Sequence, residues 1–224
     1  MERVLFICTG NTCRSPIAEA IFQEKRTSER MEAKSAGVSS VEGMPMSEGA
    51  KQALARHGLM ESHQSSYLTE NMLQWADIIL TMTKAHKQLV IEKFPSFASR
   101  THTLKEYVMD DEESLHKMEE LKSHMAQLEL NKARFFAEKE RQVDHPDDLE
   151  KEQFSVEALE KELKEQIEPH EMAIERLEWE LPSPDVRDPF GGDESIYEAT
   201  YQEVEEAVER LIQKMGNKNK RYDA

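Results

Sequence analysis

Short apolar runs alternate with helix-like segments through the N-terminal half of the chain. The apolar runs predict four strands, at 4–7, 33–38, 77–82 and 101–104, because branched residues bounded by turn residues favour buried strands. Helices are predicted between them, at about 16–25, 47–57, 69–75 and 83–93, where capping residues precede a helical period. Strands separated by helices predict an α/β fold, with a four-stranded parallel sheet and helices on both of its faces.

A different pattern occupies residues 110–180, where apolar residues recur at helical spacing. The first stretch is formed by Leu115, Met118, Leu121, Met125 and Leu128, and the second by Val156, Leu159, Leu163, Ile167, Ile174 and Leu177. Pro169 is expected to kink or interrupt the second helix, and Asp144-His145-Pro146-Asp147-Asp148 is typical of a turn. The pattern predicts an antiparallel helical hairpin at 110–180, inserted into a domain formed by 1–109 and 181–224. A largely disordered acidic insertion is the alternative.

The charge of the chain is concentrated in the same segment. The 224 residues carry a formal net charge of −16, of which the 23 acidic and 10 basic residues of 110–180 supply −13. This negative charge disfavours nucleic acid and anionic membranes as partners. We expect neither a membrane span nor a signal peptide, because no apolar run is long enough and the chain starts on a predicted strand. Two cysteines are too few for a disulfide framework, so a reducing, cytoplasmic location is expected.

The candidate chemistry lies in the loop after the first predicted strand, where Cys8 and Arg14 are separated by five residues. Ser15 and Pro16 are expected to cap and begin the next helix, so loop amides and the helix N-terminus converge on one point. This environment and the Arg14 cation favour the thiolate of Cys8, which is the nucleophilic form. Arg14 also presents two parallel donors that fit phosphoryl oxygens. The spacing predicts phosphoryl transfer through a phosphocysteine; a buried cysteine beside a helix cap is the alternative.

The loop sequence Cys8-Thr9-Gly10-Asn11-Thr12-Cys13-Arg14-Ser15 resembles the active-site loop of the low-molecular-weight protein tyrosine phosphatase family. Residues 34–38, 57–59 and 76–82 match as well. Apolar residues at helical spacing predict a last helix over 197–215, and Asp188-Pro189-Phe190 precedes it as in the family. The resemblance implies that Cys8 is the nucleophile, Arg14 the phosphoryl ligand and Asp188 the general acid. It further implies phosphate contacts from Thr9, Gly10, Asn11, Thr12, Cys13 and Ser15, a cleft wall at Phe190, and a supporting network that includes Ser35 and His63. A surface loop histidine is the alternative for His63.

Thr12 bears on the substrate class. Tyrosine-directed members of the family carry a larger aliphatic residue at this place, whereas the loop resembles that of the bacterial protein-arginine phosphatase branch. In that branch the threonine narrows the cleft and helps to position the hydrolytic water. We therefore expect a protein-arginine phosphatase, with a protein tyrosine phosphatase as the alternative. A non-catalytic phosphate-binding scaffold would predict loss of Cys8 or Asp188, and both are present.

The same features set the expected partners and cofactors. Phosphorylated proteins are the expected substrates, and no metal ligands cluster near the loop in the sequence, so neither a metal nor another cofactor is expected. The resemblance implies that Cys13 pairs reversibly with Cys8 on oxidation, while simple packing of the loop is the alternative. The hairpin is expected to hold a protein partner or substrate beside the active site through its acidic surface; a spacer that only increases solubility is the alternative.

Overall fold

The chain forms two compact units in a computed structural model that describes residues 2–59, 62–143 and 156–222. Residues Met1–Met109 and Ser183–Ala224 make up one unit, here called the sheet unit, and residues Asp110–Pro182 make up the other, the hairpin unit. Within the described residues, no helix combines the length and the apolar character needed to cross a membrane.

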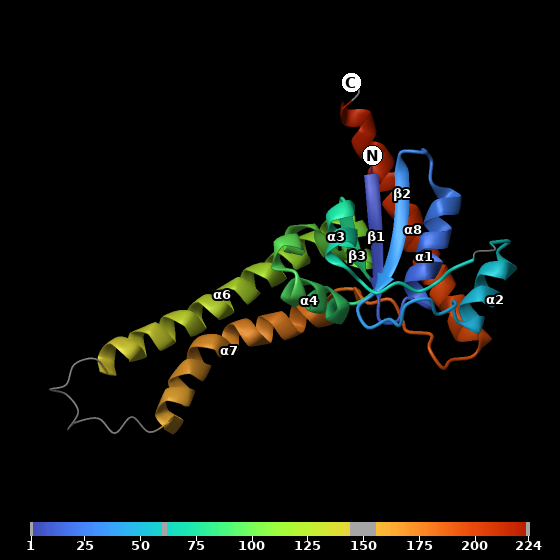
Figure 1. Cartoon of the computed structure of the whole chain (residues 1–224). Coiled ribbons are helices and arrows are strands. Elements are labelled where there is room, and N and C mark those ends of the chain that lie inside the picture. Colours follow the sequence, from blue (N-terminus) through green and yellow to red (C-terminus); the bar gives the residue numbers. More distant parts are fainter. Residues whose placement is uncertain (1, 60–61, 144–155, 223–224) are drawn as a thin grey trace. The chain divides into compact units, whose positions relative to one another are not determined.

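Four parallel strands form the sheet: β1 (Glu2–Cys8), β2 (Met31–Gly37), β3 (Ile78–Thr81) and β4 (Thr101–Thr103). Their order is β2-β1-β3-β4, of which Figure 1 labels β2, β1 and β3 side by side. This confirms the predicted four-stranded parallel sheet. The chain leaves β1 toward β2 on one side and later fills β3 and β4 on the other. Ligands of open parallel sheets bind where the strand order reverses in this way, and the loop at 9–13 lies at that point.

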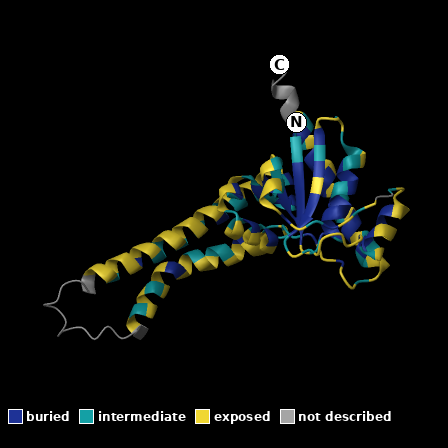
Figure 2. Ribbon diagram, in the orientation of Figure 1, coloured by how far each residue is buried: buried dark blue, intermediate teal, exposed yellow. Residues whose placement is uncertain are grey.

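Helices cover both faces of the sheet. One face carries α1 (Arg14–Lys25), α2 (Glu48–Arg56), α5 (Leu104–Val108) and α8 (Glu194–Tyr222), and the other carries α3 (Glu70–Trp75), α4 (Lys84–Lys93) and the 3-10 helix η1 (Pro95–Arg100). The strand β1 serves both cores, because Val4 and Phe6 face the first while Leu5 and Ile7 face the second. Figure 2 shows the buried sheet between these layers. The short elements α5 and η1 were not predicted from the sequence.

Several predicted helix ends have the expected local chemistry. The side chain of Ser47 accepts a hydrogen bond from the backbone of Ala50 at the start of α2, and Thr83 accepts from His86 at the start of α4. Gly58 follows α2 with a φ of +76°, a left-handed conformation that glycine adopts without a Cβ clash.

The hairpin unit consists of two antiparallel helices, α6 (Glu112–Val143) and α7 (Val156–Glu180). Lys117 of α6 pairs with Glu180, Asn131 donates to the carbonyl oxygen of Gln166, and Lys139 pairs with Glu162. Residue numbers thus increase along α6 while those of its partners on α7 decrease, which shows that the two helices are antiparallel. This confirms the predicted helical hairpin. Pro169 lies inside α7 without ending it, and Figure 1 shows that helix bent along its length. The turn predicted at 144–148 lies outside the described residues.

Two predictions about the apolar seam of the hairpin were wrong. Leu115 and Met125 are 46% and 51% exposed, whereas Leu121 is buried. A pair of helices buries only a narrow stripe on each partner, and the deeply buried residues of this unit include Phe135, which the heptad-like pattern did not select. The side chain of Val156 lies outside the described part of the chain.

Candidate active site

Cys8 is the last residue of β1, and α1 begins only six residues later at Arg14. Its thiol is buried, accepts the backbone N–H of Asn11 at 3.3 Å, and lies 3.0 Å from the Oγ of Ser15. The prediction that Ser15 caps α1 was wrong, because the N-cap residue is Cys13. The Ser15 hydroxyl lies within the first turn and contacts the Cys8 thiol instead of the helix backbone.

Hydrogen bonds turn carbonyl oxygens of the loop away from the site. Four of them accept hydrogen bonds from groups outside the loop: Cys8 O from Val38 N, Thr9 O from Ser39 N, Asn11 O from His63 Nε2, and Thr12 O from Ser47 N. In a trans peptide the N–H points opposite to the carbonyl oxygen. The amides that follow these carbonyls therefore point to the other side, where successive N–H groups form a concave site for an anion.

Gly37 at the end of β2 permits the close approach of the loop to the sheet. A Cβ at this position would lie 2.6 Å from the carbonyl oxygen of Thr9 and 3.0 Å from the backbone nitrogen of Asn11. Both contacts are with backbone atoms, which cannot move aside as a flexible side chain can. Any other residue at position 37 would displace the loop from its place beside β1.

Asn11 holds the loop from within. It is fully buried and has a φ of +54, a left-handed conformation that asparagine tolerates better than most residues. Its Nδ2 donates to the Oγ of Ser15 at 3.0 Å and to the Oγ of Ser35 at 2.8 Å, while its Oδ1 accepts from the backbone of Ser66 at 2.8 Å. The amide thus fixes both the strained loop backbone and the position of Ser15.

These contacts also determine where the Ser15 proton points. Because Ser15 accepts from Asn11, its own O–H remains to be donated, and the Cys8 sulfur at 3.0 Å is nearer than the carbonyl oxygen of Ala36 at 3.5 Å. A hydroxyl that donates to sulfur stabilises the thiolate. Ser35 in turn donates to Oε2 of Glu19 at 2.6 Å, a residue that no sequence pattern singled out.

His63 lies against the loop rather than free on the surface. Its Nε2 is 2.7 Å from the carbonyl oxygen of Asn11, which can only accept, so this nitrogen carries a proton. Burial lowers the pKa of His63 despite the opposing effect of this hydrogen bond. The histidine is therefore a neutral donor that helps to turn the Asn11 carbonyl outward.

Arg14 and Asp188 meet at the mouth of the loop. Arg14 is 4% exposed, and its Nη2 lies 2.8 Å from Oδ2 of Asp188, whose side chain is half exposed. Its Nη1 donates to the carbonyl oxygen of Val186 at 3.5 Å. Among the described residues, the buried Nε of Arg14 has no hydrogen-bond acceptor. This leaves a donor on the guanidinium edge for an oxygen of a bound anion.

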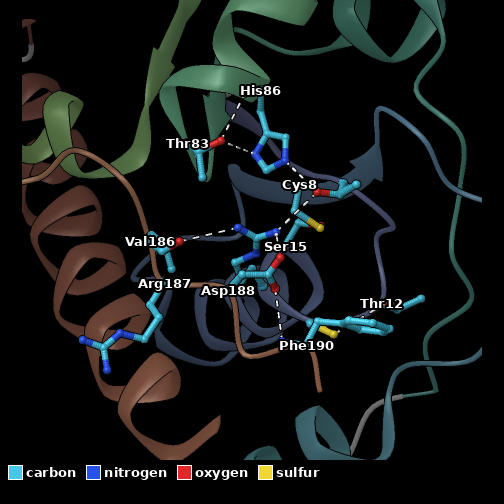
Figure 3. A network of polar contacts seen from close by, with 12 residues as sticks. Cys8, Thr12, Ser15, Thr83, His86, Val186, Arg187, Asp188 and Phe190 are labelled. Atoms are coloured by element: carbon cyan, nitrogen blue, oxygen red, sulfur yellow. Dashed lines mark hydrogen bonds and ion pairs between the residues drawn. The ribbon is translucent and has the colours of Figure 1, made fainter. Parts of the chain in front are cut away.

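The segment that carries Asp188 is held beside the end of β3 by a backbone hydrogen bond. Val186 N donates to the carbonyl oxygen of Met82 at 2.8 Å, just past the end of β3. Asp188 Oδ1 accepts from the backbone nitrogen of Phe190 at 3.2 Å, and the Phe190 side chain is 79% exposed. Figure 3 shows the side chain of Arg187 directed away from this network, whereas the neighbouring Asp188 contacts Arg14.

His86 is part of the site although nothing in the sequence singled it out. The buried ring lies between two hydroxyls, with Nε2 2.8 Å from Thr9 Oγ1 and Nδ1 2.9 Å from Thr83 Oγ1 (Figure 3). Burial and the nearby Arg14 cation lower the pKa of His86 to about 4. The ring is therefore neutral near pH 7, with one nitrogen that donates and one that accepts.

Cys13, the second cysteine, is also buried. Its Sγ donates to Ser47 Oγ at 3.1 Å and lies 3.8 Å from the hydroxyl of Tyr197. Burial raises the pKa of Tyr197, so the phenol stays protonated. Gly49 of α2 makes room for this ring, because a Cβ there would collide with it. Cys8 and Cys13 are both free thiols.

The structure brings the predicted residues together in one place. The loop supplies Thr9 and Gly10 at its rim, half-buried Thr12, and buried Cys8, Asn11, Cys13, Arg14 and Ser15. Ser35 and His63 contact the loop through Asn11, and Asp188 reaches Arg14 from the far end of the chain. A thiol, converging amides, a guanidinium and a carboxyl around one point define a cysteine-dependent phosphatase.

Comparisons with known proteins agree with this class. The family described as "Low molecular weight phosphotyrosine protein phosphatase" matches residues 3–169. The chain belongs to this family and is a hydrolase that acts on phosphoproteins.

Its relatives include enzymes named for two different substrates. A protein-arginine-phosphatase of Geobacillus stearothermophilus is 44% identical over 106 residues, which cover 47% of this chain and 71% of the relative. The low molecular weight protein-tyrosine-phosphatase PtpB of Staphylococcus aureus is 39% identical over 108 residues, covering 48% of this chain and 75% of the relative. Among solved structures, the YwlE arginine phosphatase of G. stearothermophilus matches with a TM-score of 0.64 and 28% identity, covering 97% of this chain and 95% of that chain.

Proposed function

We propose that the protein is a protein-arginine phosphatase that forms a phosphocysteine on Cys8. The observation that carries the proposal is the buried Cys8 thiol, which receives hydrogen bonds from Asn11 N and Ser15 beside an Arg14 whose Nε lacks an acceptor among the described residues. Thr12 in the loop and the 44% identical relative named as a protein-arginine-phosphatase support phosphoarginine as the substrate.

In the first step, the Cys8 thiolate attacks phosphorus while the loop amides and Arg14 hold the phosphoryl oxygens. The P–N bond breaks, and its electron pair goes to the departing guanidine nitrogen. Asp188, protonated at this stage, delivers its proton to that nitrogen. Asp188 is suited to this role because its carboxyl lies 2.8 Å from the Arg14 guanidinium, and hence next to the place where the phosphoryl group binds.

In the second step, a water molecule attacks the phosphocysteine. Asp188, now a carboxylate, takes a proton from the water, and the P–S bond breaks with its electron pair returning to sulfur. Ser15 donates to that sulfur, since its oxygen already accepts from Asn11 and the sulfur is its nearer acceptor. The hydroxyl therefore stabilises the leaving thiolate, and inorganic phosphate is released.

Phosphotyrosine is the second candidate substrate. The exposed Phe190 offers an aromatic surface beside Asp188, which would suit a phenyl ring as well as a guanidinium. The relative PtpB, named as a protein-tyrosine-phosphatase, is 39% identical to this chain. Both candidate substrates would use the same catalytic groups of the protein, and they would differ in their contacts with the wall of the cleft.

Thr12→Ile is expected to lower kcat/KM for phosphoarginine and raise it for phosphotyrosine, shifting their ratio by about tenfold or more. The change replaces a hydroxyl near the attacking water with an apolar wall that fits a phenyl ring. Steady-state kinetics on one peptide sequence carrying either modification provides the measurement. Thr12→Ser, which keeps the hydroxyl, is the matched control. If the ratio is the same in all three proteins, another residue sets the preference.

Activity is expected to survive removal of divalent metals. Cys8 supplies the nucleophile and Arg14 the positive charge that a metal ion supplies in other phosphatases. Turnover of an aryl phosphate after dialysis against EDTA should stay within about twofold of the untreated protein. A large loss that added Mg²⁺ or Zn²⁺ restores would contradict the metal-free steps proposed above.

We also propose that the protein works in the reducing cytoplasm, where its two free thiols persist.

We further propose that the hairpin unit binds a protein partner or substrate. The support for docking is the net charge of −13 at 110–180, which attracts basic surfaces in a salt-dependent way. Replacing 110–180 with a Gly/Ser linker should preserve aryl phosphate turnover and reduce dephosphorylation of basic phosphoproteins. Unchanged rates on every phosphoprotein would favour a spacer.

A further inference from the structure

Two large apolar side chains of α7 are exposed to solvent. Trp179 is 91% exposed and Met172 is 65% exposed. Single exposed apolar residues are common on protein surfaces, but large ones that are adjacent on one face mark interaction sites. Met172 and Trp179 are seven residues apart on one helix, so their side chains differ in direction by only about 20° around the helix axis.

This face of α7 is turned away from the seam with α6. Among the side chains of α7 that the structure describes, Ile167 and Leu177 are the buried ones, and each is five positions from Met172, about 140° around the helix. Packing within the hairpin therefore does not explain why Met172 and Trp179 are apolar. Glu168 and Glu175 lie within about 60° of Met172, and we call the four residues Glu168, Met172, Glu175 and Trp179 the Trp179 face.

The surface is hollowed at this face. An open depression of about 530 Å³ is lined by Met172, Glu175, Arg176, Glu178 and Trp179. Its one basic residue is held by acidic neighbours, because Arg176 lies 3.3 Å from Glu120 and 3.5 Å from Glu180. The apolar floor is thus bordered by carboxylates, with its cation already compensated.

Of the two helices of the hairpin, α7 carries the larger net negative charge. This helix has nine acidic and three basic residues, whereas α6 has seven acidic and six basic. Among the described residues, Glu168, Glu171 and Glu175 form no ion pair. The apolar pair therefore lies on the helix with the uncompensated charge, and two of these carboxylates belong to the Trp179 face.

We propose that the Trp179 face docks a basic amphipathic helix of a partner protein. Trp179 and Met172 would contact the apolar stripe of that helix, as aromatic anchors do in helix recognition, and Glu168 and Glu175 would pair with flanking Lys or Arg residues. Charge complementarity selects this occupant: a second copy of the chain presents the same acidic face, and like charges repel across an interface. The proposal concerns binding alone and is independent of the substrate proposed for Cys8.

Fluorescence anisotropy with a labelled synthetic helix tests the proposal on the full chain. The probe peptide has a leucine stripe flanked by lysines, and two control peptides replace either leucine by glutamine or lysine by glutamate. We expect the probe to bind the wild-type chain, more weakly at high salt, and both control peptides to bind about tenfold more weakly or worse. No binding of the probe, or equal binding of the glutamine peptide, would overturn the proposal.

Matched variants locate the binding on α7. The double variant Met172→Ala and Trp179→Ala should bind the probe about tenfold more weakly or worse. The double variant Glu168→Gln and Glu175→Gln should bind it about threefold more weakly. Phe136→Ala, which removes a 57% exposed ring from α6, should leave the affinity unchanged. Equal affinities in all variants would overturn the assignment to this face. A wild-type dimer in sedimentation that Trp179→Ala dissolves would overturn it in favour of a second copy.

Discussion

Replacing Cys8 with serine is expected to lower kcat on every phosphorylated substrate by about 10⁴-fold or more. The serine hydroxyl would keep the size of the thiol and its contact with Ser15, yet it would not ionise near neutral pH. Single-turnover kinetics on an aryl phosphate and a phosphopeptide measure the loss. Cys13→Ser, which changes the other loop thiol, should lose far less activity. If the kcat of the Cys8→Ser protein were within about tenfold of the wild-type value, Cys8 would not be the nucleophile.

Arg14 variants extend this test to the phosphoryl ligand. Arg14→Ala should lower kcat/KM by about 10³-fold or more, since each lost donor to a developing charge costs about 10²–10³-fold. Arg14→Lys keeps the charge but loses the planar pair of donors, of which Nε is the one without an acceptor among the described residues. If lysine restored full activity, bidentate binding by the guanidinium would be refuted.

Replacing Asp188 with asparagine should lower kcat by about 10²–10⁴-fold on substrates with a poor leaving group. The loss should be much smaller on an aryl phosphate, because a good leaving group departs without a proton. The structural basis is the 2.8 Å contact that brings the Asp188 carboxyl to Arg14. Rates measured across a series of leaving groups report this difference directly.

The neighbouring residue supplies the control for that experiment. Arg187→Ala changes a side chain directed away from the site in Figure 3 and should leave the leaving-group dependence as in the wild type. An Asp188→Asn protein that loses the same factor on every leaving group would mean that Asp188 only orients Arg14.

Local sequence signals predicted much of the fold because they depend on nearest neighbours. The apolar run of β1, the caps at Ser47 and Thr83, and the glycine after α2 all act within a few residues. The Ser15 cap was predicted by the same logic and was wrong. The Ser15 hydroxyl makes a tertiary contact with the Cys8 thiol at 3.0 Å instead of the hydrogen bond to the helix backbone that local sequence rules predict.

The parts of the site that the sequence did not predict depend on long-range contacts. Glu19 contacts Ser35, and His86 contacts both Thr83 and Thr9. The spacing of these residues along the chain does not predict that they are in contact. Asn11 offered a partial signal, since asparagine next to glycine favours a left-handed backbone. The exposure of Leu115 and Met125 likewise depends on how α6 and α7 align, which periodicity alone leaves open.

We propose that Cys8 and its surrounding groups dephosphorylate arginine in preference to tyrosine. The most direct test is kcat/KM of the wild-type chain on one peptide carrying either phosphoarginine or phosphotyrosine at the same position. A higher value for the phosphoarginine peptide is the predicted result, with both activities lost in Cys8→Ser. An equal or higher value for the phosphotyrosine peptide would contradict the claim and assign the protein to tyrosine dephosphorylation.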